Sequence, residues 1–157
     1  MNILMLDVTK IFPEYIYFLD SKNNMLMEGI FTKLIYTNEW FTMNGLYINL
    51  PIEIQGIDTT HYNKQTVFFS VSQYSTLLHQ LDLLERNILS KYCPTDKNKH
   101  KSFLLMQSLK LGYFRIFKSD TFPTKKKITG FVLKISGIWE NSQEYGLSYK
   151  IMDTTLD

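Results

Sequence analysis

The sequence predicts a mainly β domain with one long helix, and three observations lead to this fold class. Segments rich in β-branched and aromatic residues lie early and late in the chain, separated by turn residues. Between them, one segment repeats its apolar residues every three or four positions, which is the period of a helix. The 157 residues suit one domain with its own core, so residues 1–157 are expected to form a single unit.

The early part of the chain is expected to hold several short strands. They are predicted at residues 1–8, 15–19, 29–37, 40–43, 46–54 and 66–71. Pro13 breaks the chain after the first strand, and a polar turn at 21–24 follows the second. Asn44-Gly45 is the strongest short hairpin signal, so it is expected to pair the strands on either side of it. Pro51 places the end of the later strand at an edge or bulge, and the polar residues 56–65 predict a loop.

A helix is predicted from about residue 73 to residue 92. Its apolar positions form one stripe that is expected to pack on the sheet: Leu77, Leu78, Leu81, Leu84, Ile88, Leu89 and Tyr92. Ser72 or Ser75 is expected to cap its start, and Cys93-Pro94 to end it. After the helix, residues 95–101 predict a solvated loop. The second half of 102–118 predicts a further strand.

The end of the chain predicts an antiparallel hairpin of residues 128–139 and 145–152, joined by the polar loop 140–144. With that loop, apolar residues face one another on one side, as in Leu133 opposite Ile151. On the other side Lys134 faces Lys150. Like charges in this position repel, and a phosphate lying across them would remove the penalty. The alternative is that two flexible side chains splay into water.

Two structural alternatives concern the same region. Trp139 has the strand parity of Leu133 and Ile135, which favours a core position, whereas a bulge at Gly137 would turn it outward. The order of strands, helix and strands predicts a five-stranded Greek-key barrel of the OB type. The alternative is a curved antiparallel sheet with the helix packed against it.

Charge is unevenly distributed, although the formal net charge is only +2. Residues 1–96 carry six Lys or Arg and ten Asp or Glu, a net of −4. Residues 97–157 carry eleven and five, a net of +6. The C-terminal part is therefore expected to meet a polyanion.

The residue inventory argues against an enzyme, and no cofactor or metal is expected. The glycines are scattered and form no phosphate-binding loop, and the histidines lack the spacing of a shared metal site. One cysteine, Cys93, excludes an internal disulfide, and no third group supports a dyad with His100. Asp82 and Glu85, three apart on the helix, are explained by a charged solvent face.

Membrane association is not expected. No apolar run approaches the ~20 residues of a spanning helix, and no basic region with an apolar segment begins the chain. The sequence therefore predicts an intracellular protein, without distinguishing cytoplasm from nucleus.

Cations interleaved with aromatic residues form the candidate binding site. Lysines neutralise phosphates, and exposed rings stack on unpaired bases, each stack worth roughly 1–3 kcal/mol. The candidate cations are Lys110, Lys118, Lys125, Lys126, Lys127, Lys134 and Lys150, and the candidate rings are Trp40, Tyr47, Tyr62 and Phe114. Lys110, Phe114 and Lys118 share one predicted strand face. The alternatives are a core position for Phe114 and a purely solubilising role for the lysine triplet at 125–127.

Two elements of the hairpin are more specific than composition. Residues 135–140 read Ile-Ser-Gly-Ile-Trp-Glu, and residues 145–150 read Tyr-Gly-Leu-Ser-Tyr-Lys. This stretch resembles the closing hairpin of the small single-stranded-DNA-binding replication proteins of large DNA viruses and related linear DNA plasmids. The resemblance implies an OB-fold, no catalysis and a role in coating displaced strands.

The sequence thus favours a non-catalytic protein that binds single-stranded DNA in viral or plasmid replication or recombination, with RNA as the alternative ligand. Replication proteins are candidate partners, and an oligomer is compatible with this function. One alternative is a structural or polymerase-accessory subunit whose exposed rings bury in protein. The other is an enzyme whose acid pair is assembled from distant segments.

Overall fold

The computed structural model describes residues 4–23, 28–61, 64–117 and 128–155. The strands within these ranges are β1 (Ile16–Asn23), β2 (Ile30–Thr37), β3 (Thr42–Met43), β4 (Leu46–Leu50), β5 (Gly56–His61), β6 (Lys64–Phe68), β7 (His100–Ser102), β8 (Tyr113–Phe117), β9 (Ile128–Glu140) and β10 (Glu144–Thr155). The helices are α1 (Ser75–Lys91) and α2 (Leu104–Leu109), preceded by the short 3₁₀ turns η1 (Val8–Lys10) and η2 (Pro13–Tyr15).

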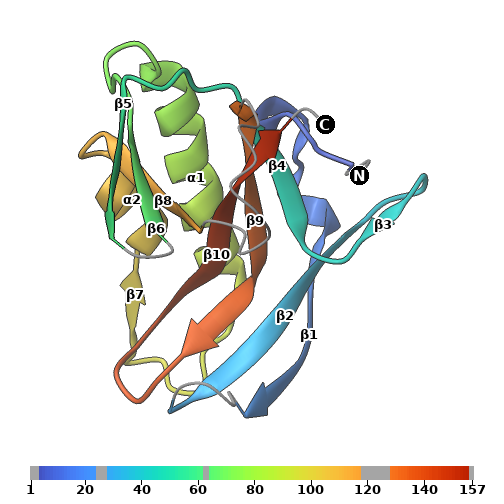
Figure 1. The fold of residues 1–157 in the computed structure, drawn as a ribbon. Coiled ribbons are helices and arrows are strands. Elements are labelled where there is room, and N and C mark those ends of the chain that lie inside the picture. The colour runs from blue at the N-terminus through green and yellow to red at the C-terminus, as the bar shows by residue number, and fades with distance from the viewer. Residues whose placement is uncertain (1–3, 24–27, 62–63, 118–127, 156–157) are drawn as a thin grey trace.

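The described strands form one mixed sheet (Figure 1). Its main path runs β1-β2-β9-β10-β8-β6-β5, with β3 on β2, β4 on β9 and β7 on β10. Most neighbours are antiparallel, but β7 and β8 run parallel to β10. The prediction of a mainly β fold with a curved sheet and one long helix is therefore confirmed, although the sheet is mixed and not wholly antiparallel.

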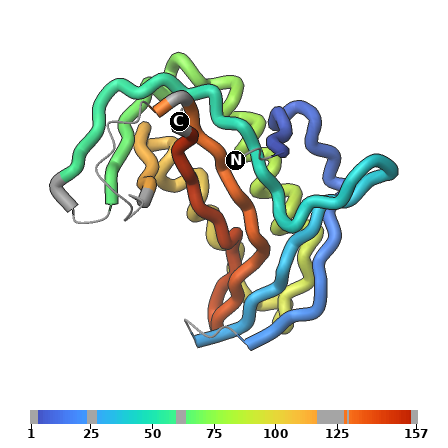
Figure 2. Tube along the Cα trace, turned by 45° about the vertical axis from the view of Figure 1, so that its right-hand side comes forward, coloured from blue at the N-terminus to red at the C-terminus, as the bar shows by residue number. Residues whose placement is uncertain are grey.

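The sheet is strongly curved. In Figure 2, β5 and β6 stand on one side, β1 and β2 on the other, and the long strands β9 and β10 lie between them. Helix α1 lies behind β9 and β10 in Figure 1, so the viewer sees the opposite face of these two strands. Buried residues of α1 share one apolar cluster with the alternate residues of the strands, such as Leu46, Ile48 and Leu50 of β4.

Helix α1 matches the predicted helix closely. Leu78, Leu81, Leu84, Ile88 and Leu89 are all buried, which confirms the core-facing stripe. Its start differs from the prediction, because Tyr74 occupies the N-cap position and no side chain caps the helix. No helix among the described residues has both the length and the apolar content to cross a bilayer.

The β9–β10 hairpin contains a bulge that divides the predicted register into two halves. Ile135, Lys134 and Leu133 face Tyr149, Lys150 and Ile151, as expected. Nearer the turn, the pairing shifts by one residue, so that Gly137 faces Ser148 and Glu140 faces Tyr145. The extra residue is Ser136, because its neighbours on both sides have partners on β10.

Three local predictions in the first part of the chain are wrong. Residues 1–8 form no strand in their described part, where only Leu6 makes a single bridge to Ile48. The polar turn at 21–24 is wrong for its described residues, which belong to β1. The described part of 56–65 is not a loop, because residues 56–61 form β5 and residues 64 and 65 begin its partner β6.

The Asn44-Gly45 turn connects strands that do not pair with each other. Gly45 has a φ of +110°, the left-handed conformation that glycine adopts readily. However, β3 pairs with β2, and β4 pairs with β9. The predicted hairpin is therefore wrong, and the dipeptide turns the chain from one pairing partner to another.

Candidate nucleic-acid interface

Three neighbouring strands carry cations side by side on the face of the sheet opposite α1. Lys134 of β9 has Lys150 of β10 as its direct cross-strand partner, which confirms this part of the predicted register. Their neighbours Leu133 and Ile151 are buried in the core, and strand side chains alternate, so both lysines lie on the other face. Lys150 is exposed and Lys134 is half-buried.

Tyr47 of β4 extends this row on the other side of Lys134. It is the cross-strand partner of Lys134 on β4, and the Lys134 Nζ lies 5.4 Å from the centroid of its ring. That distance allows a cation–π attraction worth about 0.5–1 kcal/mol at an exposed site. The ring therefore offsets part of the repulsion between the two lysines.

Arg115 of β8 adds a third cation, which the sequence prediction missed. Ile116 is the parallel partner of Ile151, and both are buried, so the residues one position earlier, Arg115 and Lys150, lie on the opposite face. Arg115 is exposed. Beyond it, cross-strand partners Thr66 and Asp58 continue the row toward the β5 edge, so the positive stretch ends at Arg115.

We call Lys134, Lys150 and Arg115 the cation row. Within the described part of the chain, no carboxylate forms an ion pair with any of the three. Like charges facing one another across strands destabilise a sheet by roughly 0.2–1 kcal/mol per pair. A bound anion would relieve this cost, so the arrangement suits an anionic ligand.

The predicted strand face of Lys110, Phe114 and Lys118 is wrong in its described part. Lys110 follows α2 as its C-cap residue and lies outside the strand, although it is exposed. Phe114 is only 2% exposed and packs edge-to-face on Phe131, with ring centroids 4.8 Å apart. Phe114 is thus a core residue, as its alternative reading held, and its ring is not available to stack on a base.

The other predicted site residues either lie away from the cation row or fall outside the residues that the structure describes. Trp40 is 85% exposed in the turn between β2 and β3, which projects from the sheet (Figure 1). Asn38 braces this turn, because its side-chain oxygen accepts hydrogen bonds from the backbone N–H groups of Trp40 and Phe41. Tyr62, Lys118 and the lysine triplet at 125–127 lie outside the described residues.

The bulge at Ser136 turns Trp139 away from the core. The core position expected for it is therefore wrong, and the alternative, a bulge that reorients it, is what the structure shows. Trp139 is half-buried, and its indole N–H donates to the Leu147 carbonyl at 3.2 Å. Ile138 takes the core position instead and is fully buried.

Glu140, the last residue of the first motif element, is a buried structural anchor. It accepts hydrogen bonds from the Tyr92 hydroxyl (2.6 Å), the Thr95 N–H and hydroxyl (2.8 and 2.7 Å) and Lys99 Nζ (2.8 Å). Burial by itself raises the pKa of this carboxyl, but the bonds from Lys99, Tyr92 and Thr95 lower it to about 2. Thr95 and Lys99, in the segment after α1 that was predicted to be a solvated loop, are thus hydrogen-bonded to Glu140 of β9.

Glu85 is also buried, and this corrects its assignment to a solvent face. Its two oxygens accept the backbone N–H groups of Leu105 and Met106 at 3.1 and 3.3 Å, at the start of α2. Burial raises the pKa of this carboxyl to about 7, although the two N–H groups act in the opposite direction. Asp82, three residues earlier on α1, forms an ion pair with Arg86.

The described residues contain no group of three His, Cys, Asp or Glu side chains that could hold a metal ion. The comparisons with known proteins add no relative. No family model matches the chain, and neither the curated proteins nor the solved structures contain a match. The resemblance of the hairpin to viral and plasmid replication proteins therefore stays a prediction.

Proposed function

We propose that this protein binds single-stranded nucleic acid without catalysis, through the face of the sheet that carries the cation row. The observation that supports this most is the row itself. Three cations on adjacent strands face one side without an acidic partner among the described residues, next to the ring of Tyr47.

The dimensions of the row fit a nucleic-acid backbone. Neighbouring strands are about 4.8 Å apart, so the row from Lys134 to Arg115 spans about 10 Å. A single phosphate backbone that lies along the row can therefore contact all three cations. Each neutralised phosphate releases counterions, and Tyr47 places an aromatic group beside the path, where an unpaired base has a face to stack.

The preference for DNA and the role in viral or plasmid replication or recombination are part of the proposal and rest on the hairpin resemblance. The OB-type barrel stays a prediction as well. Binding does not depend on barrel closure, because the cation row needs only the register of β4, β9, β10 and β8.

A salt-dependent titration tests the function. We expect oligo(dT) to bind more tightly than a duplex of equal length, with an affinity that falls steeply as salt rises. In Lys134→Ala/Lys150→Ala, the slope of log K against log salt should shrink by about 1.4, since each single-strand phosphate contributes about 0.7. The matched control is Lys10→Ala/Lys97→Ala, which removes the same charge from exposed positions outside the strands. Equal slopes in the two variants would refute the proposal.

A second candidate function follows from Trp40. Exposed tryptophans are common anchor residues of protein–protein interfaces, and the turn that Asn38 braces holds the Trp40 ring exposed. A structural or polymerase-accessory subunit would show no change in intrinsic fluorescence when poly(dT) is added, whereas base stacking would quench it.

A further inference from the structure

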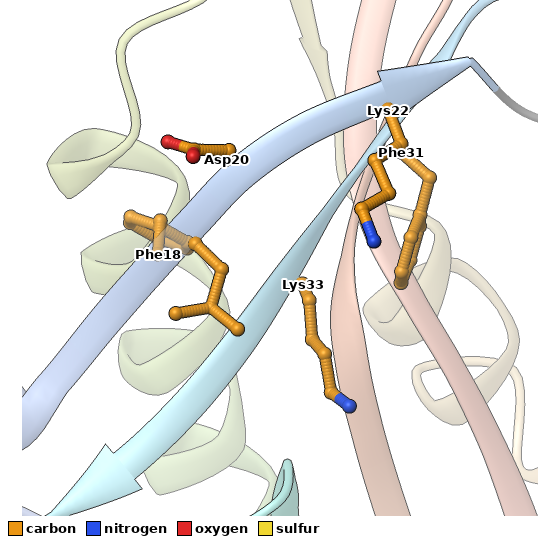
Figure 3. Close-up of a pocket in the computed structure, with 6 residues that line it drawn as sticks. Phe18, Asp20, Lys22, Phe31 and Lys33 are labelled. Atoms are coloured by element: carbon orange, nitrogen blue, oxygen red, sulfur yellow. The ribbon is translucent and has the colours of Figure 1, made fainter.

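A groove lies at the neighbouring strands β1 and β2, at the end of the sheet away from β5 (Figure 3). Its volume is about 560 Å³, and it is lined by Phe18, Leu19, Asp20, Lys22, Phe31 and Lys33. Phe31 and Lys33 alternate with the buried Thr32 and Leu34, which places them on the face opposite the core. Phe31 and Lys33 therefore lie on the same side of the sheet as the cation row, whereas Phe18, the cross-strand partner of the buried Leu34, lines the groove from the core side.

Two amines and one ring dominate the groove. Lys22 is the cross-strand partner of Phe31, and Figure 3 shows its amine beside the Phe31 ring, with the Lys33 amine on the same side. The Asp20 carboxylate points away from both amines in this view, and it forms no ion pair with either lysine. Leu19, 46% exposed, adds apolar surface.

Gly137 makes room for the Phe31 ring. A Cβ at Gly137 would lie 2.9 and 3.0 Å from two ring carbons of Phe31, and 2.1 Å from the Thr32 carbonyl oxygen. The Phe31 ring thus occupies the space that a side chain at position 137 would need, and only glycine leaves this space open. Trp139, also turned to this face by the bulge, is the cross-strand partner of Phe31 on β9.

The strand β9 connects the groove to the cation row. Lys33 is the partner of Gly137, which lies three residues after Lys134, a separation of about 10 Å along the strand. Five cations therefore follow one another across the face: Arg115, Lys150, Lys134, Lys33 and Lys22. The spacing between the two groups is similar to the length of the row itself.

We propose that the β1–β2 groove is a second nucleotide subsite of the same interface, a step that rests on the proposed function. One base stacks on Phe31, and the phosphates on either side of it meet Lys22 and Lys33. The bound single strand crosses the sheet diagonally from β8 to β1, so the site covers more nucleotides than the cation row alone.

Oligo(dT) titrations of graded length test this subsite. Phe31→Leu keeps an apolar side chain over Gly137 but removes the flat ring, and it should weaken the binding of long oligonucleotides about fivefold or more. Lys22→Ala/Lys33→Ala should lower the salt slope by about 1.4 for long oligonucleotides. Neither variant should change binding of the shortest oligonucleotides, which the cation row holds alone.

Fluorescence gives a second readout that does not depend on Phe31. In Trp40→Phe, Trp139 is the remaining tryptophan, and it lies opposite Phe31. Long oligo(dT) should quench its emission, and adding Lys22→Ala/Lys33→Ala should abolish that quenching. If Phe31→Leu does not fold, the Lys22→Ala/Lys33→Ala variant still tests the subsite.

The outcomes separate the two proposals. If the unmodified protein binds no oligonucleotide, the proposed function fails. If it binds, but the groove variants match Lys10→Ala/Lys97→Ala at every length, the subsite is refuted and the function stands. An equal loss for short and long oligonucleotides would also overturn the division into two subsites.

Discussion

Reversing one charge of the facing lysine pair should make the protein more stable and a weaker binder at once. Lys150→Glu places a carboxylate directly opposite Lys134, where a lysine now repels it. Lys150 is exposed and has no ion-pair partner among the described residues, so the change breaks no existing contact of that kind. The attraction between Lys134 and Tyr47 is left in place.

The two effects have opposite signs and similar sizes. Removing a repulsive cross-strand pair and creating an attractive one changes stability by roughly 0.2–1 kcal/mol each, so the free energy of unfolding should rise by roughly 0.5–2 kcal/mol. For binding, one single-strand phosphate contact is worth about fivefold in affinity at 0.1 M salt. Losing that contact and adding a negative charge should weaken binding by roughly 5- to 25-fold.

Urea unfolding and oligo(dT) titration, both at low and at high salt, measure these quantities. The stability gain should shrink at about 1 M salt, where charges are screened within about 3 Å. Lys97→Glu is the matched control, because it makes the same charge change in an exposed loop. If Lys150→Glu lowers stability, or binds no more weakly than Lys97→Glu, then the facing pair is not a phosphate site.

Three further changes test the packing beneath this face. Gly137→Ala should lower the free energy of unfolding, measured by thermal melting, by at least about 1–3 kcal/mol, because its Cβ would lie 2.1 Å from the Thr32 carbonyl oxygen. The control is Gly56→Ala, which should be near neutral because a Cβ there would have no atom within 4 Å. Glu140→Gln should destabilise by about 3 kcal/mol at neutral pH, since the folded-state pKa near 2 lies below the unfolded value of 4.5. In the unmodified protein that contribution is lost as pH falls from 4.5 toward 2. Glu85 behaves in the opposite way: its folded-state pKa near 7 exceeds 4.5, so stability falls by up to about 3 kcal/mol as pH rises from 4.5 through 7. Urea unfolding of Glu85→Gln against pH should show this slope removed, and an unchanged slope would contradict the assignment.

The features predicted correctly are those that a short stretch of sequence determines. The helix appears in the spacing of its own leucines, and β2 in its own β-branched and aromatic residues. The facing of Lys134 and Lys150 is predicted from a five-residue loop at 140–144. Glu140 instead pairs with Tyr145, so the loop is one residue shorter, and the extra residue Ser136 restores the predicted register beyond the bulge.

The features that were missed depend on partners far away in sequence. Strand β4 pairs with β9, so Asn44-Gly45 forms a turn, as predicted, but not a hairpin. Helix α2 has six residues, and the carboxylate that binds its first N–H groups comes from Glu85 on α1. The spacing of Lys110, Phe114 and Lys118 does not predict Arg115 as a site residue, because Lys110 lies outside β8. The alternation of buried Phe114 and Ile116 around Arg115 is the signal that would have found it.

The motif that carries the family resemblance is mostly architectural here. Gly137 and Gly146 lie where a Cβ would meet backbone oxygen at 2.1 and 2.7 Å, and Glu140 binds the loop after α1. Such residues preserve the shape of a hairpin, whatever its outer face contacts. Under the proposed function, shape and binding are largely separable. Gly137, Gly146 and Glu140 support the fold of β9 and β10, whereas phosphate contact depends on the cation row, of which only Lys150 belongs to the motif. A chain that keeps the motif but lacks Lys134 and Arg115 should fold in the same way and bind nucleic acid more weakly.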